Sequence, residues 1–335
     1  MRKAAKRPRY SFIDLFAGIG GIRIALQNAG ARCVFSSEWD KAAAATYEHA
    51  FGERPHGDIT QIDSDQIPQH DILAGGFPCQ AFSILGDKRG FADTRGTLFF
   101  EVERILRDKR PQALLLENVR HLVKHDSGRT FDVIVTKLRD LGYRVEWRIL
   151  NALDFGLPQK RERVIIVGFR SGRALEHFQW PQPTSKRAEL KDLLQPDKDV
   201  DDQHWASEAV QSSVKKRLQG KPLPPKPWIC HENKSGNISP LPYSCALRAG
   251  ASYNYLLVNG ERRLTPRENL NLQGFPPDYP LVGPASAVRR QAGNSVPVPM
   301  IEAVAKVLVK ALRASADRRP RQQEPLPFAA HASES

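Results

Sequence analysis

Cys79 is the residue of this chain best suited to covalent chemistry. It stands in the stretch Gly76-Phe77-Pro78-Cys79-Gln80, directly after an apolar run that predicts a strand. A single cysteine in a protein is more often a buried structural residue. A loop at the end of a strand, however, favours an accessible thiol, whose pKa of about 8.5 falls when cations lie nearby. The sequence therefore predicts a nucleophile at this position.

Three ionisable residues further along the chain suit the same chemistry. Glu117 follows the apolar run 113–116, where partial burial would raise its pKa and let it act as an acid. An exposed acid at the end of a strand is the alternative interpretation. The field of Arg161 and Arg163 would favour a thiolate if the fold brings them close to Cys79.

A glycine turn after the first strand points to a nucleotide-like ligand. Gly18, Gly20 and Gly21 follow the apolar run 10–15, and Glu38 lies 20 residues after Gly18, where an acid binds ribose hydroxyls in dinucleotide folds. Trp39 could stack on an adenine. A dehydrogenase would use the same acid, whereas the absence of a Walker lysine argues against ATP.

The first half of the chain alternates short apolar runs with helical patterns, which predicts an α/β fold with a doubly wound, mainly parallel sheet. The carboxyl ends of such strands share one edge, so the residues above are expected in one crevice. The predicted strands are 10–15, 33–37, 71–74, 113–116, 145–150 and 164–169, and the predicted helices are 21–29, 41–51, 97–107, 130–141 and 298–312.

The alternation stops after Phe169, and residues 177–262 carry prolines and scattered charges typical of a smaller, irregular domain. The apolar positions of the helix 298–312 have the spacing needed to pack it back on the first domain. We therefore expect a basic tail (1–9), a catalytic domain (10–180), a target-recognition domain (181–265), a hinge (266–293), a return to the catalytic domain (294–313) and a disordered tail (314–335).

Composition favours a polyanionic partner. The 335 residues carry 50 Lys and Arg against 37 Asp and Glu, a formal charge of +13. Such an excess suits nucleic acid, because bound cations release the counterions of the phosphates. No long apolar stretch or secretion signal is present, and the four cysteines form no disulfide framework, so a soluble intracellular protein is expected. His121 and His125 lack a third ligand, so no metal is expected.

Six blocks in order resemble the cytosine-C5 DNA methyltransferases, of the bacterial restriction–modification type. They extend across most of the chain, and their order makes a chance match improbable. The blocks are Phe12-Ile13-Asp14-Leu15-Phe16-Ala17-Gly18-Ile19-Gly20-Gly21, Gly76-Phe77-Pro78-Cys79-Gln80, Glu117-Asn118-Val119, Gln159-Lys160-Arg161-Glu162-Arg163, Arg263-Leu264-Thr265-Pro266-Arg267-Glu268 and Gly293-Asn294-Ser295-Val296-Pro297.

The resemblance implies that S-adenosylmethionine donates a methyl group to carbon 5 of a cytosine in a Rossmann-like domain. Cys79 is similar to the family nucleophile, Glu117 to the acid at the cytosine ring, and Arg161 and Arg163 to the basic pair near the flipped base. The positions expected to bind the cofactor are Phe16, Gly18, Gly21, Glu38, Trp39, Asp58, Ile59, Pro78, Leu98, Asn294 and Ser295, and those expected to contact DNA are Gln80, Ser83 and Gln159.

Alternative functions remain open at this point. The tRNA-methylating branch shares these motifs, although the long variable segment before Arg263 resembles the recognition region of the DNA enzymes. A silent DNA-binding homologue would be free to lose Cys79 or Glu117, and a dehydrogenase is a more distant alternative. The expected partners are double-stranded DNA and a cognate restriction endonuclease, for a monomer associated with the nucleoid and not with a membrane. Lys215, Lys216 and Arg217, and the loops 235–237 and 248–252, are candidates for further DNA contacts, with plain solvated surface as the alternative.

Overall fold

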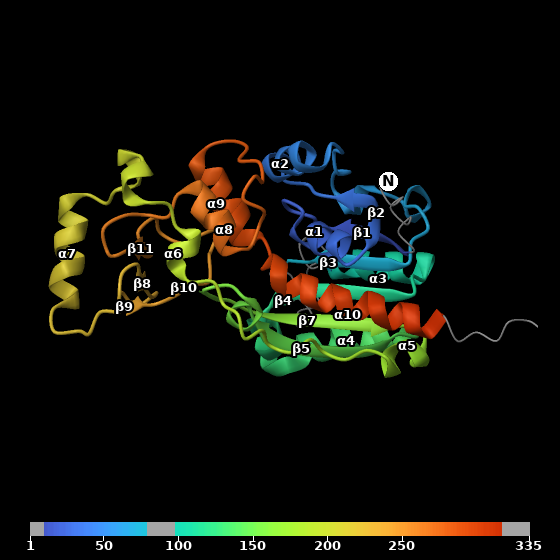
Figure 1. The fold of residues 1–335 in the computed structure, drawn as a ribbon. Helices are drawn as coiled ribbons and strands as arrows, with labels where there is room; N and C mark the ends of the chain where they lie inside the picture. Colours follow the sequence, from blue (N-terminus) through green and yellow to red (C-terminus); the bar gives the residue numbers. More distant parts are fainter. Residues whose placement is uncertain (1–9, 79–97, 317–335) are drawn as a thin grey trace, which may run out of the picture.

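The structure, a computed structural model, describes residues 10–78 and 98–316 and consists of a large part and a smaller part along one long axis (Figure 1). The large part is built on a six-stranded sheet with the order β2-β1-β3-β4-β7-β5. Neighbouring strands from β2 to β4 run parallel, and β7 is antiparallel to both β4 and β5. The strands are β1 (Tyr10–Leu15), β2 (Ala31–Ser37), β3 (Ile72–Gly76), β4 (Ala113–Val119), β5 (Arg144–Asn151) and β7 (Glu162–Phe169).

Helices cover both faces of the sheet (Figure 1). One face packs on α1 and α10 through a core that includes Ala25, Met300 and Val304, and the other face packs on α3 and α4. The predicted α/β fold with a mainly parallel sheet is therefore confirmed. The helices of the large part are α1 (Gly21–Asn28), α2 (Lys41–Phe51), α3 (Leu98–Lys109), α4 (Arg129–Asp140), α5 (Gly172–Glu176) and α10 (Val298–Ala316).

The antiparallel orientation of β7 follows from the short connection that precedes it. A parallel pair needs a long crossover, whereas antiparallel strands can be joined by a short connection. Only residues 152–161 separate β5 from β7, and they hold a 3-10 helix, Ala152–Phe155, and the two-residue strand β6, Gln159–Lys160. The chain therefore turns back beside β5 and reaches β4 from the opposite direction.

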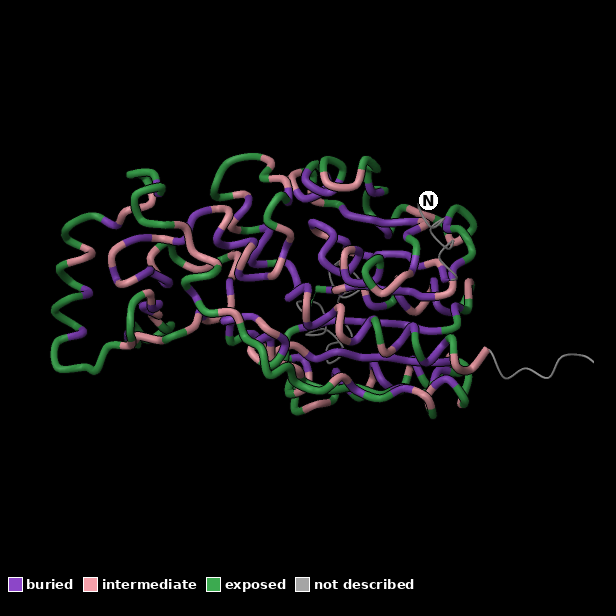
Figure 2. Tube along the Cα trace, in the orientation of Figure 1, coloured by how far each residue is buried: buried purple, intermediate pink, exposed green. Residues whose placement is uncertain are grey.

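The smaller part contains more regular structure than its sequence predicts. Strands β8 (Ile229–Glu232), β9 (Ile238–Leu241) and β11 (Leu256–Val258) form an antiparallel sheet in the order β11-β8-β9, and α7 (Glu208–Leu218) packs beside it. These strands have three or four residues each, too few for alternation to be visible in the sequence. Most of α7 is exposed, and it buries Val214 and Leu218 (Figure 2).

Three further helices lie between the two parts (Figure 1). They are α6 (Leu190–Leu193), α8 (Pro266–Leu272) and α9 (Ala285–Asn294), and a short strand, β10 (Ser244–Cys245), pairs with β6 of the large part. The last helix continues to Ala316, beyond the end predicted at 312, and its residues 308, 309, 311 and 312 pack on the core. None of the helices in the described ranges has the length and apolar character that a membrane crossing requires.

Candidate functional site

Glu117 and Arg163 form an ion pair at the carboxyl end of β4. Arg163 Nε lies 2.7 Å from Glu117 Oε1, and both side chains are 11 % exposed. Burial raises the pKa of the Glu117 carboxyl above its ordinary value, against the opposing fields of Arg163 and Arg161. The structure thus brings two of the predicted site residues together, a buried carboxyl and a guanidinium.

Arg161 lies close to this pair but is used differently. Its side chain is fully buried, with Nη1 donating to the carbonyl of Leu247 at 2.7 Å and Nη2 donating to the carbonyls of Gly293, at 2.9 Å, and Ser295. Burial, with the nearby charge of Arg163, lowers the pKa of the Arg161 guanidinium well below its ordinary value. The hydrogen bonds of Arg161 hold main-chain segments together, whereas Arg163 faces the carboxylate of Glu117.

The turn that leads to the expected nucleophile is fixed by Asn118. Its Nδ2 donates to the carbonyl of Phe77 at 2.7 Å, and both residues are buried. Gly76 is needed beside it, because a Cβ there would lie 3.3 Å from Glu117 Oε2. The sequence assigns Asn118 no role of its own. The signal that could have indicated one is an amide side chain directly after the acid at the end of a strand. Cys79, Gln80 and Ser83 lie outside the described residues.

The glycine turn and the acid after β2 meet as expected. Glu38 Oε2 accepts from the backbone N–H of Gly18 at 2.7 Å, and Oε1 accepts from that of Asp40 at 2.7 Å. Burial raises the pKa of Glu38, and these two hydrogen bonds oppose the rise. Gly18 has a φ of +56°, and a Cβ there would meet nothing within 4 Å, so the turn borders open space. Trp39 is 77 % exposed.

The remaining expected cofactor positions divide into surface and buried residues. Gly21 is brought against Ser295, because a Cβ on Gly21 would lie 3.0 Å from Ser295 Oγ. Phe16 has a positive φ of 56° at the end of β1, and Ile59 is buried directly after Asp58, whose carboxylate accepts from Thr60 N. Pro78, Asn294 and Asp58 are exposed, whereas Phe16 and Leu98 are half-buried.

Gln159 is placed inside the protein and not on a DNA-facing surface. It is completely buried, and its Nε2 donates to the carbonyl of Leu272 at 2.7 Å, while its Oε1 accepts from Leu247 N at 3.4 Å. Ser244 N also donates to Pro158 O at 2.8 Å. Gln159 and Arg161 therefore fasten the segment around residue 247 to the large part.

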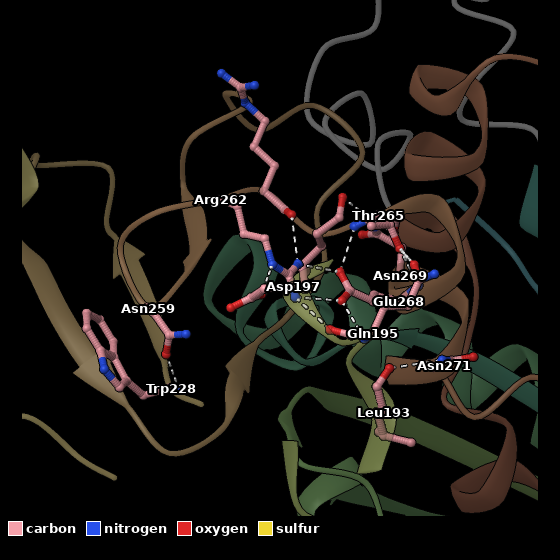
Figure 3. Close-up of polar contacts among 12 residues, drawn as sticks. Leu193, Gln195, Asp197, Trp228, Asn259, Arg262, Thr265, Glu268, Asn269 and Asn271 are labelled. Atoms are coloured by element: carbon pink, nitrogen blue, oxygen red, sulfur yellow. Dashed lines mark hydrogen bonds and ion pairs between the residues drawn. The ribbon is translucent and has the colours of Figure 1, made fainter. Parts of the chain in front are cut away.

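A buried ion pair joins Glu268 on α8 to Arg262, in the segment that follows β11 (Figure 3). Arg262 Nη1 and Nη2 each lie 3.0 Å from one carboxylate oxygen of Glu268, and Arg262 Nε lies 2.7 Å from Asp197 Oδ1. Thr265 caps α8 in a capping box with Glu268. Asn271, also on α8, donates to the carbonyl of Leu193 at 2.9 Å.

Asp14 and His125 are two further ionisable groups of the large part. Asp14 on β1 is fully buried, and that burial raises the pKa of its carboxyl well above the ordinary value. His125 Nδ1 lies 2.7 Å from Thr130 Oγ1. Within the described ranges, no three His, Cys, Asp or Glu side chains gather as metal ligands.

Comparison with known proteins gives a consistent result. The family model described as C-5 cytosine-specific DNA methylase matches residues 10–310. The chain is 56 % identical over 299 residues to the type II methyltransferase M.NgoBI of Neisseria gonorrhoeae, covering 89 % of this chain and 92 % of that protein. It is 55 % identical over 307 residues to M.HaeII of Haemophilus aegyptius, with coverage of 90 % and 94 %.

Solved structures share the fold. A DNMT2 mutant from Spodoptera frugiperda superposes with a TM-score of 0.71 at 19 % identity, covering 90 % of this chain and 99 % of that one. A putative DNA modification methyltransferase encoded in an Escherichia coli prophage gives a TM-score of 0.69 at 20 % identity, with coverage of 91 % and 99 %.

Proposed function

This chain belongs to the C-5 cytosine-specific DNA methylase family, and from that premise we propose how its residues methylate carbon 5 of a cytosine in DNA. The observation that carries the proposal is the buried Glu117–Arg163 pair one hydrogen bond away from the turn that leads to Cys79. The target cytosine is flipped out of the duplex, because stacking covers the ring face that a nucleophile must approach.

Cys79 is the proposed nucleophile. Its thiolate adds to carbon 6 of the cytosine, and the electron pair of the 5,6 double bond moves to carbon 5, which becomes an enamine carbon able to take a methyl group. The proton on carbon 5 then leaves, the double bond re-forms and the thiolate is released. Covalent addition thus divides one difficult substitution into easier steps.

Glu117 and Arg163 stabilise the charge that this addition creates. Electron density moves toward ring nitrogen N3, and a protonated carboxyl there donates a hydrogen bond to it. The raised pKa of Glu117 suits that task. Arg163 holds the carboxyl in place and contributes a positive field near the base. We assign Arg161 a positioning role, because it binds three carbonyls.

S-adenosylmethionine fits the crevice after β1 and β2, where it would supply the electrophilic methyl group. The fit rests on an open glycine turn at Gly18, the buried carboxylate of Glu38 and the exposed indole of Trp39. Glu38 would accept hydrogen bonds from ribose hydroxyls, and Trp39 would cover the adenine. Phe16, Gly21, Asp58, Ile59, Pro78, Leu98, Asn294 and Ser295 would complete the site.

Residues 181–265 are the proposed target-recognition domain, joined through residues 266–293 to the catalytic domain. The exposed helix α7 carries Lys215, Lys216 and Arg217, which suit phosphate contacts. Gln80 and Ser83, close to Cys79 in the sequence, are proposed DNA contacts, while Gln159 holds the segment around Leu247. We propose a cytoplasmic, nucleoid-associated monomer that acts on double-stranded DNA alongside a restriction endonuclease, as the names of its type II relatives suggest.

Trapping on 5-fluorocytosine tests the mechanism. With S-adenosylmethionine and a duplex that carries 5-fluorocytosine at the target, fluorine cannot leave as a cation, so elimination stops and a covalent complex should survive denaturing electrophoresis. The Cys79→Ala variant should form no complex while still binding DNA. An adduct on tRNA alone would overturn the DNA substrate. DNA binding without any adduct would support a silent binder.

A further inference from the structure

The loop formed by residues 247–253 lies within the proposed recognition domain, but it is held by contacts from Arg161 of the large part and from α9. Arg161 Nη1 binds the carbonyl of Leu247 at 2.7 Å. Gly293 lies so close that a Cβ there would be 2.5 Å from Ala249 N, so main chain packs on main chain. Arg289, on α9, donates to the carbonyls of Ala251, at 3.1 Å, and Ser252, at 3.3 Å. The loop is therefore fixed at both ends.

Arg248 is the charged side chain on this fixed loop. Its backbone N–H donates to Tyr255 Oη at 2.9 Å, and its guanidinium lies over the same ring, 4.7 Å from the centroid. Within residues 10–78 and 98–316, the guanidinium makes no hydrogen bond or ion pair. By contrast, Arg217, Arg262 and Arg263 all use theirs on acceptors of the protein.

This arrangement leaves the planar fork of N–H donors of Arg248 without an acceptor among the residues that the structure describes. The ring of Tyr255 fixes the plane of the guanidinium through a cation–π contact, and the clamped backbone fixes its origin. Phosphate contacts tolerate mobile side chains, whereas reading a base edge requires donors at set positions. Guanine presents O6 and N7 in the major groove as the acceptor pair that an arginine fork matches.

We propose that Arg248 reads a guanine of the target sequence through the major groove, which makes it a specificity-determining residue. The inference rests on the proposed function, since it assumes a duplex whose flanking bases are read while the cytosine is flipped. This guanine then lies on the side of the DNA that faces the loop 247–253. Arg161, which holds that loop, lies near the Glu117–Arg163 pair. Tyr255 acts through Arg248 as a positioning residue.

The test begins with the recognised site, obtained by bisulfite sequencing of plasmid from cells that make the full chain. Synthetic duplexes then carry 7-deazaguanine, which lacks the N7 acceptor, at one guanine at a time. For the wild-type protein, kcat/KM should fall roughly 5- to 150-fold at one position, the range of one bidentate contact. The Arg248→Gln and Arg248→Lys variants should show no further loss there and should methylate sites with another base at that position.

Controls separate the outcomes. Lys310→Gln removes one exposed charge on α10 and should keep the wild-type discrimination, and Tyr255→Phe, which keeps the ring, should retain most of it. A uniform loss for Arg248→Gln at all sequences, with a smaller salt slope, would mean a phosphate contact and overturn the proposal. Unchanged kinetics for both Arg248 variants would also overturn it. If the wild-type protein methylates no cytosine at all, the proposed function itself fails.

Discussion

The side-chain amide of Asn118 donates a hydrogen bond of 2.7 Å to the carbonyl of Phe77, joining two buried residues 41 positions apart. Asn118 belongs to β4, one residue after Glu117, and Phe77 stands two residues before Cys79. One hydrogen bond thus connects the strand of the proposed acid to the turn of the proposed nucleophile. This contact fixes the turn at Phe77 relative to the strand that carries Glu117.

Asn118→Ala should slow adduct formation on 5-fluorocytosine DNA while leaving cofactor affinity nearly unchanged. The buried Phe77 carbonyl loses its donor, which costs about 1–3 kcal/mol and releases the turn. Single-turnover trapping and calorimetry with S-adenosylmethionine would measure the two effects. Val119→Ala, at an exposed neighbouring position, is the control. Equal trapping rates in both variants would exclude this role for Asn118.

Arg163→Gln should move the alkaline limb of the kcat/KM profile to higher pH. Arg163 lowers the pKa of Glu117, so its removal raises that pKa further, and the protonated carboxyl persists to higher pH. Arg120→Gln breaks an exposed pair with Glu162 at 2.6 Å and should leave the limb in place. A limb that stays fixed or moves to lower pH in Arg163→Gln would show that Glu117 is not the titrating acid.

Trp39→Ala should weaken binding of S-adenosylmethionine by about 1–3 kcal/mol, on the scale of base–aromatic stacking, and should change DNA affinity little. Trp147→Ala is a matched control, because this indole on β5 is also partly exposed, at 39 %. Calorimetry of both variants would decide. Unchanged cofactor affinity in Trp39→Ala would leave Trp39 as a surface residue without this function.

Glu268→Ala should lower the free energy of unfolding by about 3–5 kcal/mol, since it leaves the buried Arg262 guanidinium without its main partner. The double variant Arg262→Met with Glu268→Leu should regain much of that loss, because a buried pair can be replaced by apolar side chains of similar size. Denaturant titrations of the three proteins provide the comparison. If the double variant is no more stable than Glu268→Ala, the unpaired Arg262 guanidinium is not the cause of the loss.

The elements of the large part could be predicted because their apolar runs are long and their caps are explicit. β1 and α2 have the expected bounds, and α2 ends at Gly52, which has a φ of +69°. The strands β8, β9 and β11 could not be predicted, since they have three or four residues and their pairing is fixed by contacts distant in the sequence.

Some residues of the candidate site could be placed from the sequence, and others could not. Residues at strand ends, such as Glu38 and Glu117, could be placed from the sequence because parallel strands share one carboxyl edge. The difference between Arg161 and Arg163 could not, because it depends on which carbonyls the surrounding chain brings within reach. Nor could the burial of Gln159, whose partner Leu272 lies 113 residues away.

Arg161 and Arg289 donate hydrogen bonds to main-chain carbonyls of the loop 247–253, and Arg289 also lies over the ring of Tyr253, 4.2 Å from its centroid. A carbonyl is the same in every amino acid, so these hydrogen bonds place no demand on the side chain of Arg248, whereas the ring contact does favour an aromatic residue at 253. Under the proposed function, the side chain at 248 could therefore change, and with it the recognised DNA sequence, while the hydrogen bonds that hold the loop stay the same. Divergence of target choice then requires few compensating changes elsewhere in the chain.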